Sequence, residues 1–159
     1  KRLEYLPKSL AVIPVSSLQK NVADVVREVT QGEMADIVFE TTGNADLIPE
    51  EFKVLHQQGK MCMLSSPRKA TKFDFHDFCN AGSFDIIGAH ISSQTEQPSF
   101  DNPWTCVRNS ETFFRMLATG QMEVASLISH RVPYTEAPQV YKNLLKDRTQ
   151  SMGVVFEWK

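Results

Sequence analysis

The sequence predicts an α/β fold in which the strands run parallel to one another. Short apolar runs without polar alternation recur along the chain, and such runs are typical of strands covered on both faces. Segments with helix signals separate these runs, and parallel neighbours require crossover connections of about a dozen residues. From about residue 91 onward the pattern is of a mixed α+β kind, so two structural regions are expected.

The N-terminal segments predict a short helix, a short strand and a longer helix. Residues 1–10 are expected to end a helix, and the apolar residues 11–15 are expected to form a brief strand. Ser16 is the predicted N-cap of the next helix, because Gln19 three residues later completes a capping box. Gly32 is expected to end that helix, as glycine commonly does past the last turn. One helical stripe supports the assignment: Val22, Val25, Val26 and Val29.

A strand, a helix and a second strand follow, and together they predict a β-α-β unit. The run ADIVFE at 35–40 is the first strand, and it leads into a turn of small residues. Pro49 suits the first helical position, and Gly59 is expected to end the helix. The run KMCMLSS at 60–66 is the second strand. Because ligands of open α/β sheets collect where strand ends meet, the turn after residue 40 is a candidate binding site.

The remaining chain predicts one more strand of this kind and then a different pattern. The run SFDIIGAHISS at 83–93 is a short strand that ends in a turn of small residues. Residues 92–103 are polar and rich in turn formers, which indicates a hinge or a surface connection. A helix is expected to begin at Asn102-Pro103 and to end at Gly120. The last expected elements are a strand at 127–133, a helix capped by Thr135 and a strand at 153–158.

The composition argues against several classes of function. The 17 basic and 19 acidic residues are interspersed and leave a net charge of −2, so no surface for nucleic acid is expected. No apolar run approaches the roughly 20 residues that a membrane-spanning helix needs, so no membrane partner is expected. The 3 cysteines are widely spaced and include no CxxC pair, which indicates neither disulfides nor a zinc site. Free thiols favour a cytoplasmic location.

A search for catalytic groups and metal ligands yields no residue of either kind. No two of the 4 histidines lie at the i, i+4 spacing of a helical metal site, so surface or structural roles are favoured. Ser65-Ser66 lacks the G-x-S-x-G context of a hydrolase. The 7 glycines are too far apart for a G-x-G-x-x-G turn or a P-loop. A dinucleotide site is therefore expected only in part, at the turns after ETTG, MLSS and IIGAH.

Five stretches of the chain resemble a known family, the medium-chain dehydrogenase/reductases. These stretches are ADIVFETTG, GKMCMLSSP, FDIIGAH, LATGQMEVASLISHRVPYTEAPQVYKNLL and GVVFEW, in the order and spacing of that family's C-terminal half. The set is similar to the zinc-type alcohol, polyol and threonine dehydrogenase branch. The resemblance implies a partial Rossmann-type, doubly wound parallel sheet, without its first strands and glycine-rich turn, at residues 1–90. Residues 91–159 would be an α+β return segment that packs on a catalytic domain in relatives.

The resemblance also implies where a nicotinamide cofactor would lie. The turn that contains Thr41, Thr42 and Gly43 corresponds to the segment under the adenosine side of the cofactor. Main-chain groups near four other residues correspond to segments that hydrogen-bond the nicotinamide carboxamide: Leu64, Ser65, Ala89 and Ile91. The chain departs from relatives at Ser65, where many have glycine. It also departs at Gly153, where some place a basic residue toward the pyrophosphate.

The activity that the resemblance implies is hydride transfer between an alcohol or polyol and NAD or NADP, with NAD favoured by analogy. The glycine-rich turn, the zinc ligands and the proton relay of the family all correspond to positions before residue 1. This segment alone is therefore expected to be inactive. Two alternatives stay open: a non-catalytic oligomerisation or binding module on the same scaffold, and a zinc-free relative of the quinone reductases.

The implied topology carries two further expectations. If residues 11–15, 36–40 and 84–88 are strands three, four and six of the dinucleotide fold, strands one and two are absent. Strand 36–40 would then have no inner neighbour, and the segment would belong to a longer protein or complex. The strand near Ile86–Ile91 corresponds to a sheet edge that pairs across a two-fold axis in relatives, so a homo-oligomer is expected.

Overall fold

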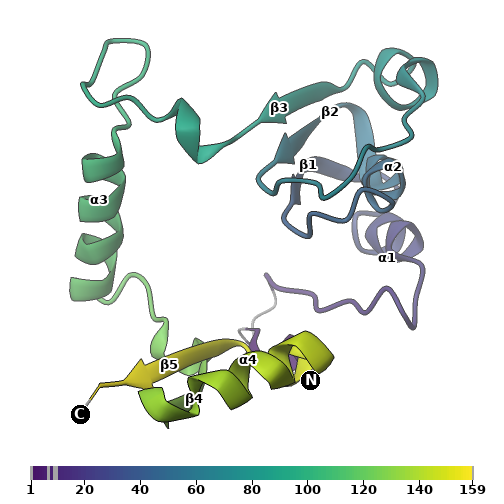
Figure 1. Cartoon of the computed structure of the whole chain (residues 1–159). Helices are drawn as coiled ribbons and strands as arrows, with labels where there is room; N and C mark the ends of the chain where they lie inside the picture. The colour runs from purple at the N-terminus through teal and green to yellow at the C-terminus, as the bar shows by residue number, and fades with distance from the viewer. Residues whose placement is uncertain (1, 7, 9–10, 159) are drawn as a thin grey trace. The chain divides into compact units, whose positions relative to one another are not determined.

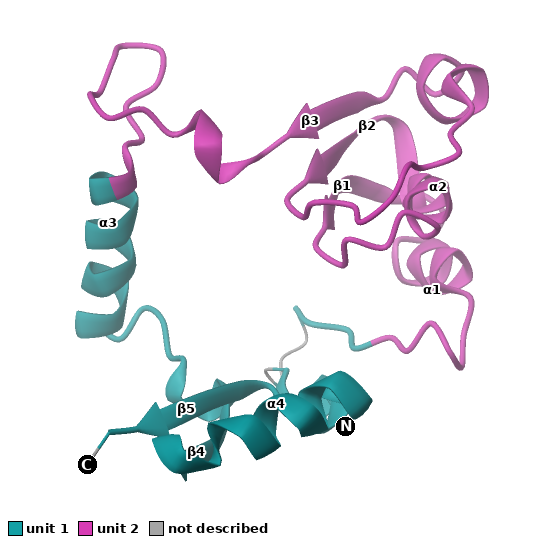
Figure 2. Ribbon diagram, in the orientation of Figure 1, with its two compact units in different colours: residues 1–14, 107–159 teal, residues 15–106 magenta. Residues whose placement is uncertain are grey.

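The computed structural model describes residues 2–6, 8 and 11–158, and the chain divides into two compact units. One unit consists of residues 15–106, and the other consists of residues 1–14 and 107–159 (Figure 2). The helix expected over 1–10 lies partly outside the described residues, and within them Arg2–Tyr5 form the 3-10 helix η1. The division of roles between residues 1–90 and 91–159 stays a prediction.

The unit of residues 15–106 is built on a parallel three-stranded sheet, which confirms the predicted α/β class. Its strands are β1 (Ala35–Glu40), β2 (Leu55–Met63) and β3 (Asp85–Gly88), in the order β1-β2-β3 (Figure 1). Both ladders are parallel: Val38 of β1 is paired with Met61 of β2, which is paired in turn with Ile86 of β3. The carboxyl ends of all three strands therefore lie at one edge of the sheet.

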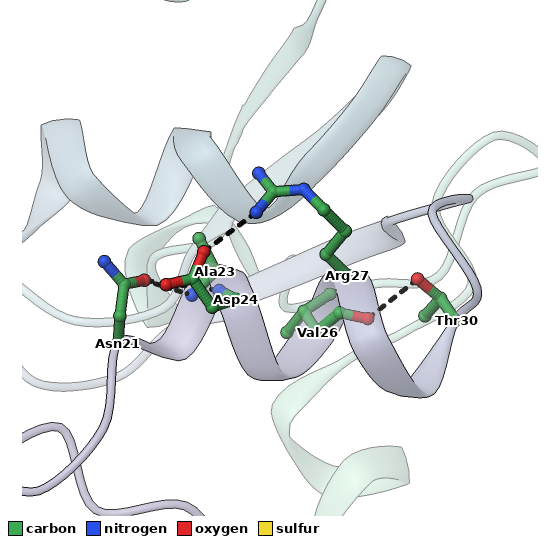
Figure 3. Close-up of polar contacts among 6 residues, drawn as sticks. All are labelled: Asn21, Ala23, Asp24, Val26, Arg27 and Thr30. Carbon is green, nitrogen blue, oxygen red and sulfur yellow. Dashed lines mark hydrogen bonds and ion pairs between the residues drawn. The ribbon is translucent and has the colours of Figure 1, made fainter.

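The helix α1 (Val22–Val29) precedes β1 and begins later than predicted. Its N-cap is Asn21, whose side-chain oxygen accepts hydrogen bonds from Ala23 N at 2.9 Å and Asp24 N at 3.3 Å (Figure 3). The prediction of Ser16 as the cap was wrong. The Ser16 carbonyl instead accepts from the N–H groups of Gln19 and Lys20 in a separate turn. Asparagine and serine are comparable caps, so local preference alone does not choose between them.

The connection between β1 and β2 is shorter than predicted. The helix α2 (Ile48–Glu51) passes directly into the 3-10 helix η2 (Phe52–Val54), and β2 begins at Leu55 rather than at residue 60. The ladder pairs Ala35 with Leu55 and then Ile37 with Lys60, so residues 56–59 bulge from the strand. Gly59 lies in this bulge, where a Cβ atom would be 2.9 Å from the His56 carbonyl oxygen, and it does not end a helix.

The core of this unit lies on one face of the sheet. Ile48, Phe52, Leu55 and Met61 form its buried centre. Aromatic rings of the segment before β3 pack around Phe52, with the ring centroid of Phe73 at 5.1 Å and that of Phe84 at 5.6 Å. This segment includes η3 (His76–Asn80), a single π-helical turn. Burial of these apolar side chains stabilises the β1–β2 pairing that positions the strand ends.

The opposite face of the sheet differs from the expectation that both faces are covered. Successive side chains of a strand alternate between faces, and Val38 lies on the core face. Ile37 and Phe39 lie on the other face, where they are 47% and 60% exposed. Ile87 of β3 is 43% exposed. The apolar run of β1 predicted burial on both faces, but the described residues cover only the face that carries Val38.

The segment at 11–15 forms no strand, and that prediction was wrong. Residues 11–15 lie in a turn and in irregular structure, and the recorded ladder of β1 runs to β2. Pro14 has no N–H to donate to a ladder, and so brief a run needs a neighbouring strand to become extended structure. Within the described residues β1 therefore pairs with β2 alone, which agrees with the expectation that strand 36–40 has no inner neighbour.

Within its described residues, the second unit contains two α-helices and a two-stranded parallel sheet. The helix α3 (Cys106–Ala118) begins after the expected Asn102-Pro103, and Gly120 with φ +70° follows its end. The strands β4 (Ile128–Pro133) and β5 (Gly153–Glu157) are paired in parallel, as their separation by a helix predicts. That helix is α4 (Ala137–Lys146), whose N-cap is Glu136 without a side-chain hydrogen bond, so Thr135 does not cap it.

Candidate functional site

Three turns meet at the carboxyl edge of the sheet β1-β2-β3. We define the first turn as residues 41–43, the second as residues 64–66 and the third as residues 89–91. The Leu64 N–H donates to the Glu40 carbonyl at 3.0 Å, and the Ala89 N–H donates to the Met63 carbonyl at 3.0 Å. A Cβ atom placed on Gly43 would lie 3.8 Å from Ser65 Cβ. The structure thus brings the predicted site residues to one rim, and their contact with a cofactor stays a prediction.

The centre of this arrangement is Glu40, which the sequence analysis did not single out. Glu40 is fully buried at the last position of β1. Its Oε1 accepts hydrogen bonds from Thr42 N at 2.7 Å, Thr42 Oγ1 at 2.6 Å and Gly43 N at 3.0 Å. Its Oε2 accepts a hydrogen bond from the hydroxyl of Ser65. One carboxylate therefore joins the first turn to the second.

These donors decide the charge of the buried group. Burial by itself would raise the pKa of Glu40, because desolvation penalises the anion. The hydroxyls of Ser65 and Thr42 and the N–H groups of Thr42 and Gly43 outweigh burial, and together they hold the pKa of Glu40 below its usual value. Glu40 is therefore an anion at neutral pH, and its charge is satisfied by four hydrogen bonds.

A second carboxyl group near this site behaves in the opposite way. Burial, with the negative charge of Glu40 as a smaller cause, raises the pKa of Glu51 to about 7. Its Oε2 is buried and has no hydrogen-bond partner among the described residues. Glu51 lines a cavity of about 520 Å³ between the start of α1 and the end of α2, and Thr42 borders the same cavity.

The second and third turns border an open cavity of about 480 Å³. Leu64, Ala89 and Ile91 line it, and all three are predicted site residues. The side chains of Leu64 and Ile91 are 49% and 71% exposed, so they present apolar surface at its rim. His90 also lines it, and its Nδ1 is 2.8 Å from Ser92 Oγ. The cavity lining includes no acidic, lysine or arginine side chain among the described residues.

The remaining histidines and the cysteines suggest no second site. His56 lies 3.1 Å from the Asp36 carboxylate, His76 lies 2.9 Å from that of Asp77, and His130 lies 2.8 Å from the Ser129 hydroxyl. Residues 2–6, 8 and 11–158 contain no cluster of three or more histidine, cysteine, aspartate or glutamate side chains suited to a metal ion. Within the same ranges, none of the helices combines the length and apolar character needed to span a bilayer.

Gly153 lies where the start of β5 closely approaches the chain just before β4. It is the first residue of β5, and a Cβ atom placed on it would lie 2.9 Å from the Leu127 carbonyl oxygen. Such a distance is too short for a real side chain, so a basic residue could stand here only after a shift of the backbone. The Ser129 hydroxyl donates to the Gly153 carbonyl at 3.0 Å and further holds this junction. Any side chain larger than that of glycine is therefore disfavoured at this position.

Sequence reasoning missed Glu40 and His90 although both stand next to predicted residues. The available signal for Glu40 was a charged residue that ends an apolar run and is followed by Thr-Thr-Gly, which supplies hydroxyl and N–H donors. For His90 the signal was its place between Ala89 and Ile91. The bond between Glu40 and Ser65 had no local signal, because it joins residues 25 positions apart.

Comparison with known proteins places the site in context. The family model described as zinc-binding dehydrogenase matches residues 1–104. An L-threonine 3-dehydrogenase from Chromobacterium violaceum is 22% identical over 160 residues, which cover 99% of this chain and 42% of that protein. An erythritol/L-threitol dehydrogenase from Mycolicibacterium smegmatis is 18% identical over 135 residues, which cover 85% of this chain and 33% of that protein.

Solved structures show the same fold. An alcohol dehydrogenase from Thermus sp. ATN1 has a TM-score of 0.71 at 20% sequence identity. The match covers 94% of this chain and 39% of the Thermus chain. A short chain alcohol dehydrogenase from E. coli CFT073, solved in complex with NADH, has a TM-score of 0.75 at 11% sequence identity. The match covers 99% of this chain and 42% of the E. coli chain. The chain thus spans between 33% and 42% of the length of the curated relatives it matches.

Proposed function

The chain belongs to the zinc-binding dehydrogenase family, and from this premise we propose that it forms part of the cofactor site of an NAD(P)-dependent oxidoreductase. The reaction is hydride transfer between an alcohol or polyol and the nicotinamide ring. The observation that carries the proposal is the meeting of three turns at the carboxyl edge of a parallel sheet, the position where ligands of such sheets bind.

The chemistry of the turns fits the two ends of a dinucleotide. The second and third turns border a cavity lined by main chain and by side chains without a formal charge, which suits the neutral carboxamide group of the nicotinamide. The first turn directs the N–H groups of Thr42 and Gly43 inward to Glu40, so it presents exposed threonines to a ligand. That surface suits an adenosine better than a phosphate. We favour NAD over NADP by analogy with polyol and threonine dehydrogenases.

The role of this chain is binding and orientation rather than proton transfer. When bound, the cofactor supplies the hydride chemistry, and the protein contributes placement and electrostatics. Among the described residues, no group of side chains suits a catalytic zinc, which needs three protein ligands and an open position. We therefore propose that any zinc is held by residues outside this segment, and that the segment alone does not turn over substrate.

Two further properties belong to this proposal. Cys62, Cys79 and Cys106 form no disulfide among the described residues, which supports a reducing, cytoplasmic location. β3 is an edge strand within the described residues, and its Ile86 and Ile87 are each 43% exposed. An open apolar edge invites pairing with another chain. We propose a homo-oligomer formed through this strand.

Calorimetric titration of the full-length protein with NADH and NADPH tests the function. We expect binding of NADH, and failure to bind either nucleotide would contradict the proposal. Ala89→Leu places a larger side chain at the cavity of the second and third turns and is expected to weaken NADH binding by about 10-fold or more. Ala118→Leu makes the same change at an exposed position of α3 and is expected to leave binding unchanged.

A further inference from the structure

Glu40 hydrogen-bonds to both the first and the second turn. Its main-chain carbonyl accepts the N–H groups of Leu64 at 3.0 Å and Ser65 at 3.1 Å, in addition to the donors held by its carboxylate. Four predicted cofactor-site residues therefore donate to this one residue: Thr42, Gly43, Leu64 and Ser65. We propose that Glu40 is a positioning residue, which sets the spacing of the two turns and thereby the affinity for the cofactor. The inference rests on the proposed function.

The burial of Glu40 makes its bonds mutually dependent. An ionised carboxylate that is removed from water is costly unless donors replace its hydration. At Glu40 those donors come from two turns, and Ser65 is 25 positions away along the chain. The carboxylate is fully satisfied only when both turns are in place. A displacement of either turn therefore leaves a buried charge with fewer donors, and the arrangement resists such displacement.

The same bonds determine which surface the first turn offers. Consecutive N–H groups in a tight turn can form a concave site for an anion. Here the N–H groups of Thr42 and Gly43 are already directed to the Glu40 carboxylate at 2.7 and 3.0 Å. Glu40 thus fills that site from within the protein. The exposed side chains of Thr41 and Thr42 are left to contact the uncharged adenosine.

The test compares Glu40→Ala with Glu40→Gln in the full-length protein by calorimetric titration with NADH. Alanine removes the acceptor for four donors and is expected to raise the Kd for NADH by about 10- to 100-fold. Glutamine keeps an oxygen for the three donors of the first turn, and its amide can donate to the Ser65 hydroxyl. We expect glutamine to restore the Kd to within about 5-fold of wild type.

The titration separates positioning from a merely structural role. Molecules that fail to fold lower the binding stoichiometry and leave the Kd of the folded molecules unchanged, whereas misplaced turns raise the Kd. The matched control is Glu50→Gln, which removes an exposed carboxylate of α2 that is paired with Lys53. The control should bind NADH as wild type does.

If Glu40→Ala does not fold, Ser65→Ala removes a single donor and keeps the others. It is expected to raise the Kd for NADH by about 3- to 10-fold. An unchanged Kd in the folded Glu40→Ala or Ser65→Ala variant, a change confined to stoichiometry, or a glutamine variant as weak as alanine would each overturn the inference. A wild-type protein that binds neither NADH nor NADPH would instead overturn the proposed function, and this inference with it.

Discussion

Two carboxyl groups near the carboxyl end of β1 show how local surroundings set the charge of a residue. Glu40 is more deeply buried than Glu51, yet its pKa is lowered, whereas the pKa of Glu51 is raised to about 7. The difference lies in the donors. Glu40 accepts four hydrogen bonds, whereas Glu51 Oε2 has no partner among the described residues and lies near the Glu40 charge.

The raised pKa of Glu51 predicts a loss of stability as pH rises. The folded protein holds this proton more tightly than the unfolded chain, so the free energy of unfolding falls as pH rises from about 4.5 through about 7. Glu51→Gln removes this loss. We expect the variant to be more stable than wild type at pH 8, by on the order of 1–3 kcal/mol, and similar to it near pH 4.5.

Urea unfolding of both proteins at pH 4.5 and pH 8 measures the difference. Glu50→Gln is the control, since this neighbouring carboxylate is 61% exposed and pairs with Lys53. An exposed pair contributes at most about 1 kcal/mol, so its effect should be small at both pH values. If Glu51→Gln changed the free energy of unfolding by the same amount at both pH values, the expectation that Glu51 loses its proton between them would be contradicted.

Gly43 allows the first turn to approach the second. Its φ is +66°, and a Cβ atom there would lie 3.1 Å from the Ser66 carbonyl oxygen. Gly43→Ala is expected to cost about 1–2 kcal/mol for the backbone conformation and more for the contact with Ser66. Gly120→Ala is a matched control, because its φ is +70° and nothing lies within 4 Å of the added atom. Equal losses in thermal or urea unfolding would show that the contact with Ser66 has no effect.

At the scale of the element, the start of α1 depends on one cap. Asn21 satisfies two N–H groups of the first turn, and Thr30 at the other end donates to the Val26 carbonyl at 2.7 Å (Figure 3). The Thr30 hydroxyl also accepts from Met34 N at 2.9 Å. Arg27 and Asp24 form an exposed ion pair on the helix surface. Such pairs contribute little, so the caps define where this short helix begins and ends.

Asn21→Ala is expected to lower the free energy of unfolding by about 0.5–2 kcal/mol. Asn21→Asp keeps an acceptor for the N–H groups of Ala23 and Asp24 and should retain most of the stability. Ser16→Ala is the informative comparison, since Ser16 is the cap that the sequence pattern favours. A loss at Ser16 as large as that at Asn21, measured by urea unfolding, would contradict the cap that the structure shows.

At the scale of the whole molecule, the sheet β1-β2-β3 has two edge strands within the described residues, β1 and β3. Parallel sheets are normally covered on both faces, whereas these two strands expose four large apolar side chains: Ile37, Phe39, Ile86 and Ile87. Further polypeptide against β1 and a second copy against β3 would both reduce this exposure.

Light scattering on the full-length protein tests the association through β3. We expect a dimer or larger oligomer at micromolar concentration. Ile87→Lys places a charge at the exposed edge strand and is expected to shift the mass toward the monomer. Val107→Lys makes a similar change at an exposed position of α3 and should leave the mass unchanged. A strictly monomeric wild-type protein would remove this proposal.

Much of the fold could be predicted from local pattern. The strands β1, β3, β4 and β5 were all expected close to their observed positions, because each is an apolar run bounded by turn residues. Their parallel pairing follows from the crossovers between them. The seven candidate site residues were placed by resemblance, and the structure brings the three turns that contain them to one edge.

The sequence by itself determined the class of the fold and the parallel direction of its strands, since apolar periodicity and crossover length are properties of neighbouring residues. Only the tertiary structure decided that Asn21 caps α1, that β2 begins at Leu55 with a bulge, and that Glu40 holds Ser65. Caps and bulges are choices among local options of similar free energy, and packing selects one. The bond between Glu40 and Ser65 exists because strand register brings two distant turns together, and no local pattern encodes that register.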